Sequence, residues 1–232
     1  MFEQQRVVGA LRRAGVIDGI WWACRSAVDR SLDLYSEADG HTPTLLGYTR
    51  HTLFCDRLDR VFSCGRYAVS PGDMHGGLDQ LYAELSPRDI DTMPELDPAL
   101  VIRSDVDGSP GWVHNGRRFV LSSIGYGKID SVRWDRKSVT KQKVARQSDS
   151  GPTQPSLFET IGTAELGEQQ MLLVASTQLD LPTFVVGHSL TPDTGNYELV
   201  LGRTRENADG GRPWRWRVDL LQGPFAGGGR RG

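Results

Sequence analysis

The chain has 232 residues, of which 38% are hydrophobic and 24% are charged, and its formal net charge at pH 7 is −2. A chain of this length and composition can bury a core without disulfide or metal support, and its small net charge identifies no class of partner. No apolar run approaches the ~20 residues that a membrane-spanning helix needs, so the sequence predicts no membrane association.

The N-terminal residues and the cysteines indicate the cellular compartment. Residues 1–14 are amphipathic and lack the apolar stretch and cleavage site of a secretory signal peptide. The three cysteines, Cys24, Cys55 and Cys64, form an odd set without the spacing of a disulfide framework. Together these features predict a cytoplasmic protein with reduced thiols.

Helical periodicity dominates the first hundred residues, where apolar side chains recur at steps of three and four. This pattern predicts helices over residues 3–14, 17–38, 49–63 and 78–85. Another helix is expected to begin at Ser86-Pro87, because serine is a common N-cap and proline is tolerated in the first turn.

From residue 101 the pattern changes to alternation. Residues 111–123 predict a β-hairpin whose turn is Asn115-Gly116, a strong hairpin signal. Further strands are expected over residues 129–134 and near 170–176, 183–189, 197–204 and 214–221. In the last of these strands, strict alternation places four apolar residues on one face: Trp214, Trp216, Val218 and Leu220.

The order of these elements predicts an α+β fold, with an N-terminal helical region followed by a mostly antiparallel β-sheet. The expected organisation is a mainly helical region at 1–100, a basic β-hairpin region at 101–147, a polar linker at 148–156, a β-meander region at 157–222 and a disordered tail at 223–232. These boundaries do not imply independent domains, because one sheet can begin before the linker and continue after it.

Positive charge is concentrated in residues 111–146, which hold nine basic and two acidic residues and all four lysines of the chain. The candidate binding residues in this segment are Arg117, Arg118, Lys128, Arg133, Arg136, Lys137, Lys141 and Lys143. They alternate with Phe119, Tyr126 and Trp134, and nucleic-acid binders combine cations for phosphates with aromatic faces for bases. The ordinary alternative is a solvated basic face.

A second pattern is Asp135-Arg136-Lys137, which resembles the second half of the motif of restriction-type nucleases. On a strand, a carboxylate and a lysine two residues apart share a face, where they could hold a divalent metal and orient a water molecule. The upstream acid would be Asp105 or Asp107. Such triplets also arise often by chance.

A third pattern is the pair His51 and Cys55, four residues apart on a predicted helix, with Cys64 just beyond the end of that helix. A zinc ion could be held by these three residues. Because no paired C-x-x-C supports such a site, the sequence favours free thiols, no bound metal and no cofactor.

No complete catalytic set can be assembled from these patterns, and the sequence therefore favours a non-enzymatic function. The leading hypothesis is a cytoplasmic binding or regulatory protein that acts through protein contacts, for which Trp21-Trp22, Trp214 and Trp216 would supply apolar surface. The first alternative is a nucleic-acid-binding protein that uses residues 117–146. The second is a metal-dependent nuclease around Asp135 and Lys137.

Overall fold

The computed structural model describes residues 2–68, 78–147 and 181–222, and it has the predicted α+β class. The helices are α1 (Phe2–Arg13), α2 (Val16–Asp33), α3 (Pro43–Val61), α4 (Leu78–Tyr82), α5 (Pro87–Thr92) and α6 (Val139–Arg146). The strands are β1 (Ile102–Arg103), β2 (Gly111–His114), β3 (Arg117–Ser123), β4 (Thr183–Leu190), β5 (Tyr197–Thr204) and β6 (Trp214–Asp219). The predicted linker at 148–156, the strand near 170–176 and the tail at 223–232 lie outside the described residues.

The N-terminal helices form where the apolar periodicity predicts them, although their ends differ. α3 begins at Pro43 rather than at residue 49, because Thr42 caps it and accepts a hydrogen bond from the Leu45 amide through its side chain. Ser86 caps α5 as expected, by accepting from the Asp89 amide. Within the described ranges, no helix combines the length and the apolar character needed to cross a bilayer.

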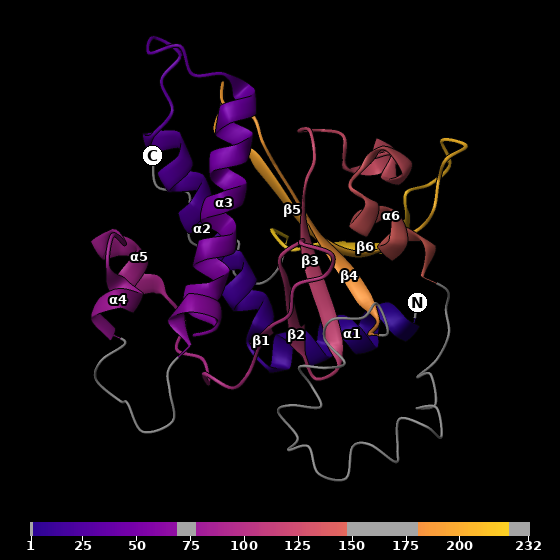
Figure 1. Cartoon of the computed structure of the whole chain (residues 1–232), viewed down its shortest axis with the longest axis horizontal. Coiled ribbons are helices and arrows are strands. Elements are labelled where there is room, and N and C mark those ends of the chain that lie inside the picture. The colour runs from indigo at the N-terminus through magenta and orange to yellow at the C-terminus, as the bar shows by residue number, and fades with distance from the viewer. Residues whose placement is uncertain (1, 69–77, 148–180, 223–232) are drawn as a thin grey trace.

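The six strands form one sheet in the order β1-β2-β3-β4-β5-β6, and Figure 1 labels each of them. Every neighbouring pair is antiparallel except β3 and β4, which run parallel and align Ser123 with His188. The β2–β3 hairpin turns at Asn115-Gly116 as predicted, and the positive φ values of 46° and 67° at these residues fit a type I′ turn.

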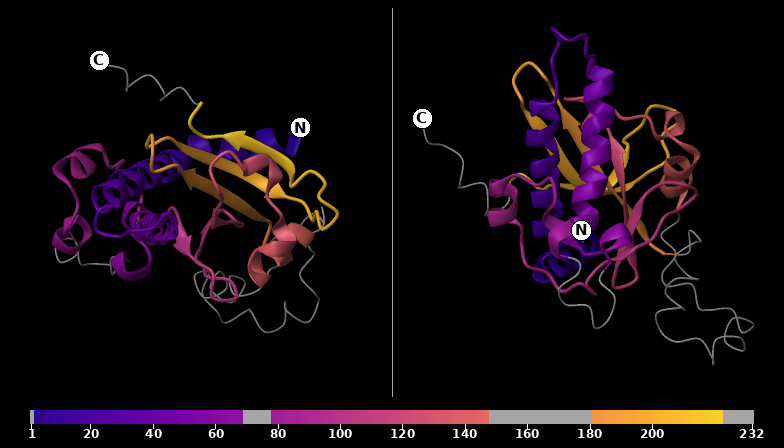
Figure 2. Two further views of the ribbon diagram at one scale, coloured as in Figure 1. Left: turned by 90° about the horizontal axis from the view of Figure 1, so that it is seen from above. Right: turned by 60° about the vertical axis from the view of Figure 1, so that its left-hand side comes forward.

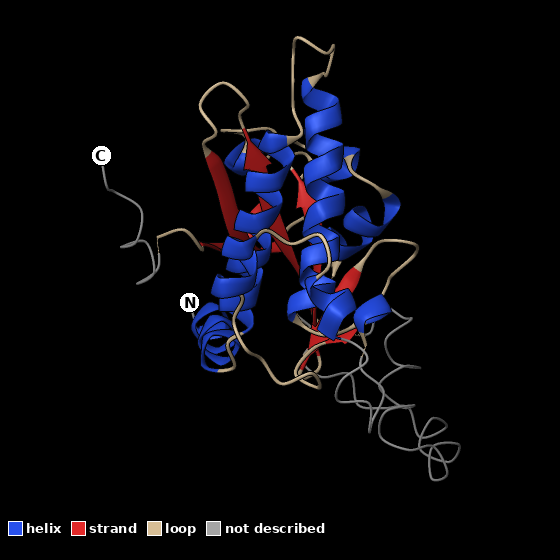
Figure 3. Cartoon of the chain, turned by 90° about the vertical axis from the view of Figure 1, so that its left-hand side faces the viewer, coloured by secondary structure: helices blue, strands red, loops and turns tan. Residues whose placement is uncertain are grey.

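The central strands of the sheet bury apolar side chains on both faces. On β3, Phe119 and Leu121 pack in the core beneath α1, α2 and α3, whereas Val120 belongs to a second core on the opposite face. Figures 2 and 3 show the α2–α3 pair covering one side of the strands, and Figure 2 shows α6 on another side. The fold therefore has helical cover on both sides of its sheet.

The segment that covers the second face was expected to contain a strand at residues 129–134, and this expectation is wrong. The chain instead forms two single 3-10 turns, η2 (Ile129–Ser131) and η3 (Trp134–Arg136), before it enters α6. Trp134 is fully buried, and its indole nitrogen donates to the Pro213 carbonyl at 2.7 Å. Tertiary burial of this one residue overrides the local strand preference.

In β6, the predicted single apolar face is broken by a bulge. Thr204 pairs with Trp214 whereas its neighbour Arg203 pairs with Trp216, so Arg215 has no partner in the register. Trp214 therefore packs in the second core, edge-on to Trp134, and Trp216 packs beneath α1.

Helix α1 is attached to the end of the sheet by one acidic side chain. Glu3 accepts a hydrogen bond from the Trp216 indole at 2.7 Å through one carboxylate oxygen. Its other oxygen pairs with Arg203 on β5. One side chain of the first helix therefore contacts both of the last two strands.

Two changes in β6 test this description of the bulge. Trp214→Ala should lower the free energy of unfolding by ~3–5 kcal/mol, because it empties a buried site that is 8% exposed and removes a hydrogen bond to the Ile129 carbonyl. Arg217→Ala breaks an ion pair with the exposed Asp130 and should cost less than ~1 kcal/mol. Urea melts of both variants measure the difference, and equal losses would contradict the assignment of Trp214 to the second core.

Candidate anion-binding site

Most of the predicted binding residues do not converge on one surface. Arg118 is fully buried, where its Nε donates to Ser104 Oγ at 3.2 Å. Arg133 pairs with Asp135, and Lys143 pairs with Asp107. Arg117 donates to the Asn115 carbonyl in its own hairpin turn, while Lys128 and Arg136 are exposed.

Lys137 and Lys141 differ from the other predicted residues because both are half-buried on the side of the sheet where β3 ends. Lys137 Nζ donates to the Ser123 carbonyl at 2.7 Å, and Lys141 Nζ donates to Ser109 Oγ at 3.3 Å. Burial lowers the pKa of both ammonium groups, and each lysine pKa falls without a carboxylate to raise it. Both charges have lost contact with water, and within the described ranges neither has gained an acidic partner.

A buried arginine that the sequence patterns did not single out lies beside these lysines. Arg50 on α3 is 3% exposed, and its Nε donates to His188 Nδ1 at 3.1 Å. One of its terminal nitrogens donates to Ser123 Oγ at 3.0 Å. The parallel pairing of β3 and β4 places Ser123 and His188 side by side to receive this guanidinium.

The fully buried His188 also contacts a second histidine. Its Nε2 lies 3.2 Å from Nδ1 of His51, and the two rings are stacked with centroids 5.5 Å apart. On the far side of the His51 ring, Nε2 lies 3.9 Å from the sulfur of Cys55. These contacts form a chain that runs from the buried guanidinium to the partly exposed face of α3.

The direction of hydrogen bonding along this chain follows from Arg50. A guanidinium donates and cannot accept, so His188 Nδ1 is the acceptor in that pair. In a neutral imidazole the other nitrogen then carries the proton, so His188 Nε2 donates to His51 Nδ1. The same reasoning puts the proton of His51 on Nε2, which makes the outer end of the chain a donor.

We call Arg50, His51, Lys137, Lys141 and His188 the basic cluster. Its members influence one another electrostatically: Arg50 and Lys141 both lower the pKa of His51, although burial is the larger cause. Burial, Arg50, His51 and Lys137 together hold the pKa of His188 well below its usual value. Within the described parts of the chain, no carboxylate forms an ion pair with any member.

The two acidic residues of α3, Asp56 and Asp59, are paired with arginines outside the cluster. Asp59 lies two turns beyond His51, where it accepts from Arg103 and from the Trp112 indole. Arg103 also pairs with Asp105. Within the described residues, these neighbouring acids are therefore bound to an arginine of their own and form no ion pair with the basic cluster.

The arrangement does not suit the zinc site considered from the sequence. Burial raises the pKa of the Cys55 thiol to about 12, and His51 Nε2 carries a proton, so neither group offers a lone pair readily. Cys64 is buried and its thiol points to Asp59. Among the described residues, no group of three or more His, Cys, Asp and Glu side chains is placed to hold a metal ion, and Cys24, Cys55 and Cys64 are free thiols.

The nuclease-like triplet also lacks the geometry that its chemistry requires. It lies on the turn η3 rather than on a strand, and both oxygens of Asp135 accept from Arg133. Asp105 and Asp107, the expected upstream acids, are paired with Arg103 and Lys143. Lys137 belongs to the basic cluster instead.

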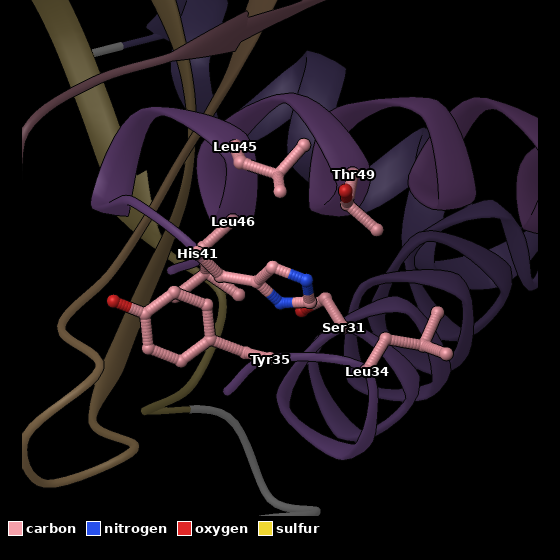
Figure 4. A pocket seen from close by; sticks show the side chains of 7 residues that line it. All are labelled: Ser31, Leu34, Tyr35, His41, Leu45, Leu46 and Thr49. Atoms are coloured by element: carbon pink, nitrogen blue, oxygen red, sulfur yellow. The ribbon is translucent and has the colours of Figure 1, made fainter. Parts of the chain in front are cut away.

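A separate cavity of about 210 Å³ lies between the end of α2 and the start of α3. Figure 4 shows its lining, in which His41 and Tyr35 stand beside the leucines Leu34, Leu45 and Leu46. His41 Nδ1 accepts from the Ser36 amide at 3.1 Å and fixes the turn between the helices. The cavity is smaller than typical small-molecule sites, which measure roughly 300–1,000 Å³.

Comparisons of the chain with protein-family models, curated proteins and solved structures find no match. The chemistry of the basic cluster is therefore the basis for assigning a function.

The hydrogen-bond chain makes a spectroscopic prediction. Both His51 and His188 should be neutral at about pH 7 and should carry their proton on Nε2, because Arg50 imposes this direction. Nitrogen-15 chemical shifts of labelled histidine distinguish the two tautomers. An Nδ1-protonated form of His188 would contradict the derived direction.

The buried histidine also makes stability depend on pH. The pKa of His188 is depressed in the folded protein, so below about pH 6.5 the unfolded chain takes up a proton that the folded chain does not. As the pH falls below about 6.5, this residue should reduce the free energy of unfolding with a slope that approaches about 1.4 kcal/mol per pH unit.

His188→Asn provides the comparison, because asparagine keeps one acceptor and one donor but does not titrate. Urea melts at several pH values should give a shallower pH dependence for the variant than for the unmodified protein. The same slope in both proteins would show that His188 does not cause the effect.

Proposed function

We propose that the protein binds a small oxyanion of the phosphate type through the basic cluster. The observation that carries this proposal is Arg50, a permanently charged guanidinium that is 3% exposed and has no carboxylate partner among the described residues. Its own protein contacts are a neutral imidazole and a hydroxyl.

The energetic argument concerns uncompensated charge. Removing a cation from water costs several kcal/mol, and structures normally offset this cost with an opposite charge. In the basic cluster, Lys137 and Lys141 add two further cations beside Arg50 and the histidines. An anion bound among them would supply the missing charge, and several oxygen atoms would let it accept from groups on both α3 and α6.

The nucleic-acid hypothesis retains its phosphate component but loses support for base recognition. Of the three aromatic residues that alternate with the basic ones, Phe119 and Trp134 are buried in the two cores and cannot stack on a base. Tyr126 is 44% exposed. We therefore place phosphate recognition ahead of sequence-dependent binding of nucleic acid.

The hypothesis of protein contacts stays a prediction, with weaker support than the sequence suggested. Trp22 and Trp214 are buried, and Trp22 donates its indole N–H to the Asp89 carbonyl within the chain. Trp21 and Trp216 are partly buried against the main core. Because these side chains pack within the chain, they leave less apolar surface for a protein partner than the sequence suggested.

Titration calorimetry with methyl phosphate, a phosphate monoester, tests the proposed function. The unmodified protein should bind it, and Lys141→Gln should weaken binding about tenfold or more, because a charged hydrogen bond contributes ~1.5–3 kcal/mol. Lys143→Gln is the matched control: it lies two residues further along α6 and pairs with Asp107, so it should bind as the unmodified protein does. Equal affinities in the two variants, or no binding at all, would contradict the proposal.

A further inference from the structure

We infer that the basic cluster selects a doubly charged anion that carries no proton of its own, namely a phosphate monoester dianion, over hydrogen phosphate. This inference rests on the proposed function and goes beyond it by naming the ligand class. It follows from the direction of the hydrogen bonds rather than from the number of charges.

The cluster groups that can contact a ligand are all hydrogen-bond donors. The ammonium groups of Lys137 and Lys141 have N–H protons and no lone pair to offer. The direction imposed by Arg50 makes the outer nitrogen of His51 a donor as well. An arrangement of this kind satisfies oxygen acceptors, and a ligand O–H would have to compete with the cluster's own cations for the serine and carbonyl oxygens beside it.

Each oxygen atom beside these donors already accepts a hydrogen bond from a member of the cluster. The Ser123 carbonyl accepts from Lys137, and Ser123 Oγ accepts from Arg50. Ser109 Oγ accepts from Lys141 and contacts Thr140 Oγ1 at 3.1 Å. Cys55, the remaining polar neighbour of His51, is a weak acceptor.

A P–OH group placed in this environment would lose its hydrogen bond to water without a full replacement. Leaving a buried donor unsatisfied is costly, and the penalty is large enough to change affinity by tenfold or more. Hydrogen phosphate always brings such a group at neutral pH. A phosphate monoester has lost it above its second pKa of about 6.

Charge separates the monoester from the diester. An internal phosphodiester, as in the backbone of nucleic acid, also lacks a P–OH but carries a single negative charge. Three cations, Arg50, Lys137 and Lys141, favour the dianion because each interacts with the full ligand charge. The ligand class is therefore a terminal phosphate group rather than an internal phosphodiester.

Four small anions tested by calorimetry at about pH 8 separate these properties. Methyl phosphate and sulfate are doubly charged and have no O–H; inorganic phosphate is doubly charged and has one; dimethyl phosphate has none and is singly charged. We expect methyl phosphate and sulfate to bind, and the other two to bind about tenfold more weakly or worse. Lys143→Gln should preserve this order.

A second variant tests the origin of the selectivity. His51→Gln replaces an N–H that can only donate with an amide that can also turn its oxygen to the ligand. The preference for methyl phosphate over inorganic phosphate should fall from about tenfold to less than about threefold. Circular dichroism would show that the variant is folded.

The outcomes distinguish the inference from the proposed function. If inorganic phosphate binds the unmodified protein as tightly as methyl phosphate, the selectivity is refuted while anion binding stands. An unchanged preference in folded His51→Gln overturns the role of the hydrogen-bond direction. If none of the four anions binds, the proposed function fails and the inference fails with it.

Discussion

The pairing of β3 with β4 determines where the charged groups of this protein meet. It joins the β2–β3 hairpin to the meander of β4, β5 and β6. Among the described strands this is the one parallel pair, so β3 and β4 end at the same side of the sheet. Ser123 and His188 consequently lie next to each other, and Arg50 reaches both from α3. Because a guanidinium only donates, this contact then fixes the proton positions of two histidines.

Much of the fold follows from local patterns, and the failures have identifiable physical causes. Apolar periodicity predicts α1, α2 and α3, and Asn115-Gly116 predicts the turn of the β2–β3 hairpin. Both patterns depend only on residues close together in the sequence. The strand predicted at residues 129–134 failed because Trp134 is buried against Trp214, about eighty residues further along the chain. The bulge opposite Arg203 likewise depends on pairing between strands, which alternation within β6 does not encode.

The candidate site was predictable in part. Lys137 and Lys141 were among the predicted binding residues because positive charge is concentrated locally, but six other residues of that group lie elsewhere or are paired. Arg50 and His188 are 138 residues apart, and neither stands in a charge run or motif. His51 was considered as a metal ligand, and its role changed once its partner proved to be a buried histidine rather than a cysteine pair. A sequence cannot show which buried charge lacks a counterion, because that is a property of the assembled contacts.

The attachment of α1 through Glu3 has a consequence for how the chain is made. Its partner Trp216 follows 213 residues later. At about 5–20 residues per second, the ribosome needs roughly ten to forty seconds to synthesise the intervening chain. Throughout that interval the apolar side of α1 has no completed sheet to cover. Final docking of the first helix must therefore wait until β6 has been synthesised, so its polar attachment forms late in the folding of the chain.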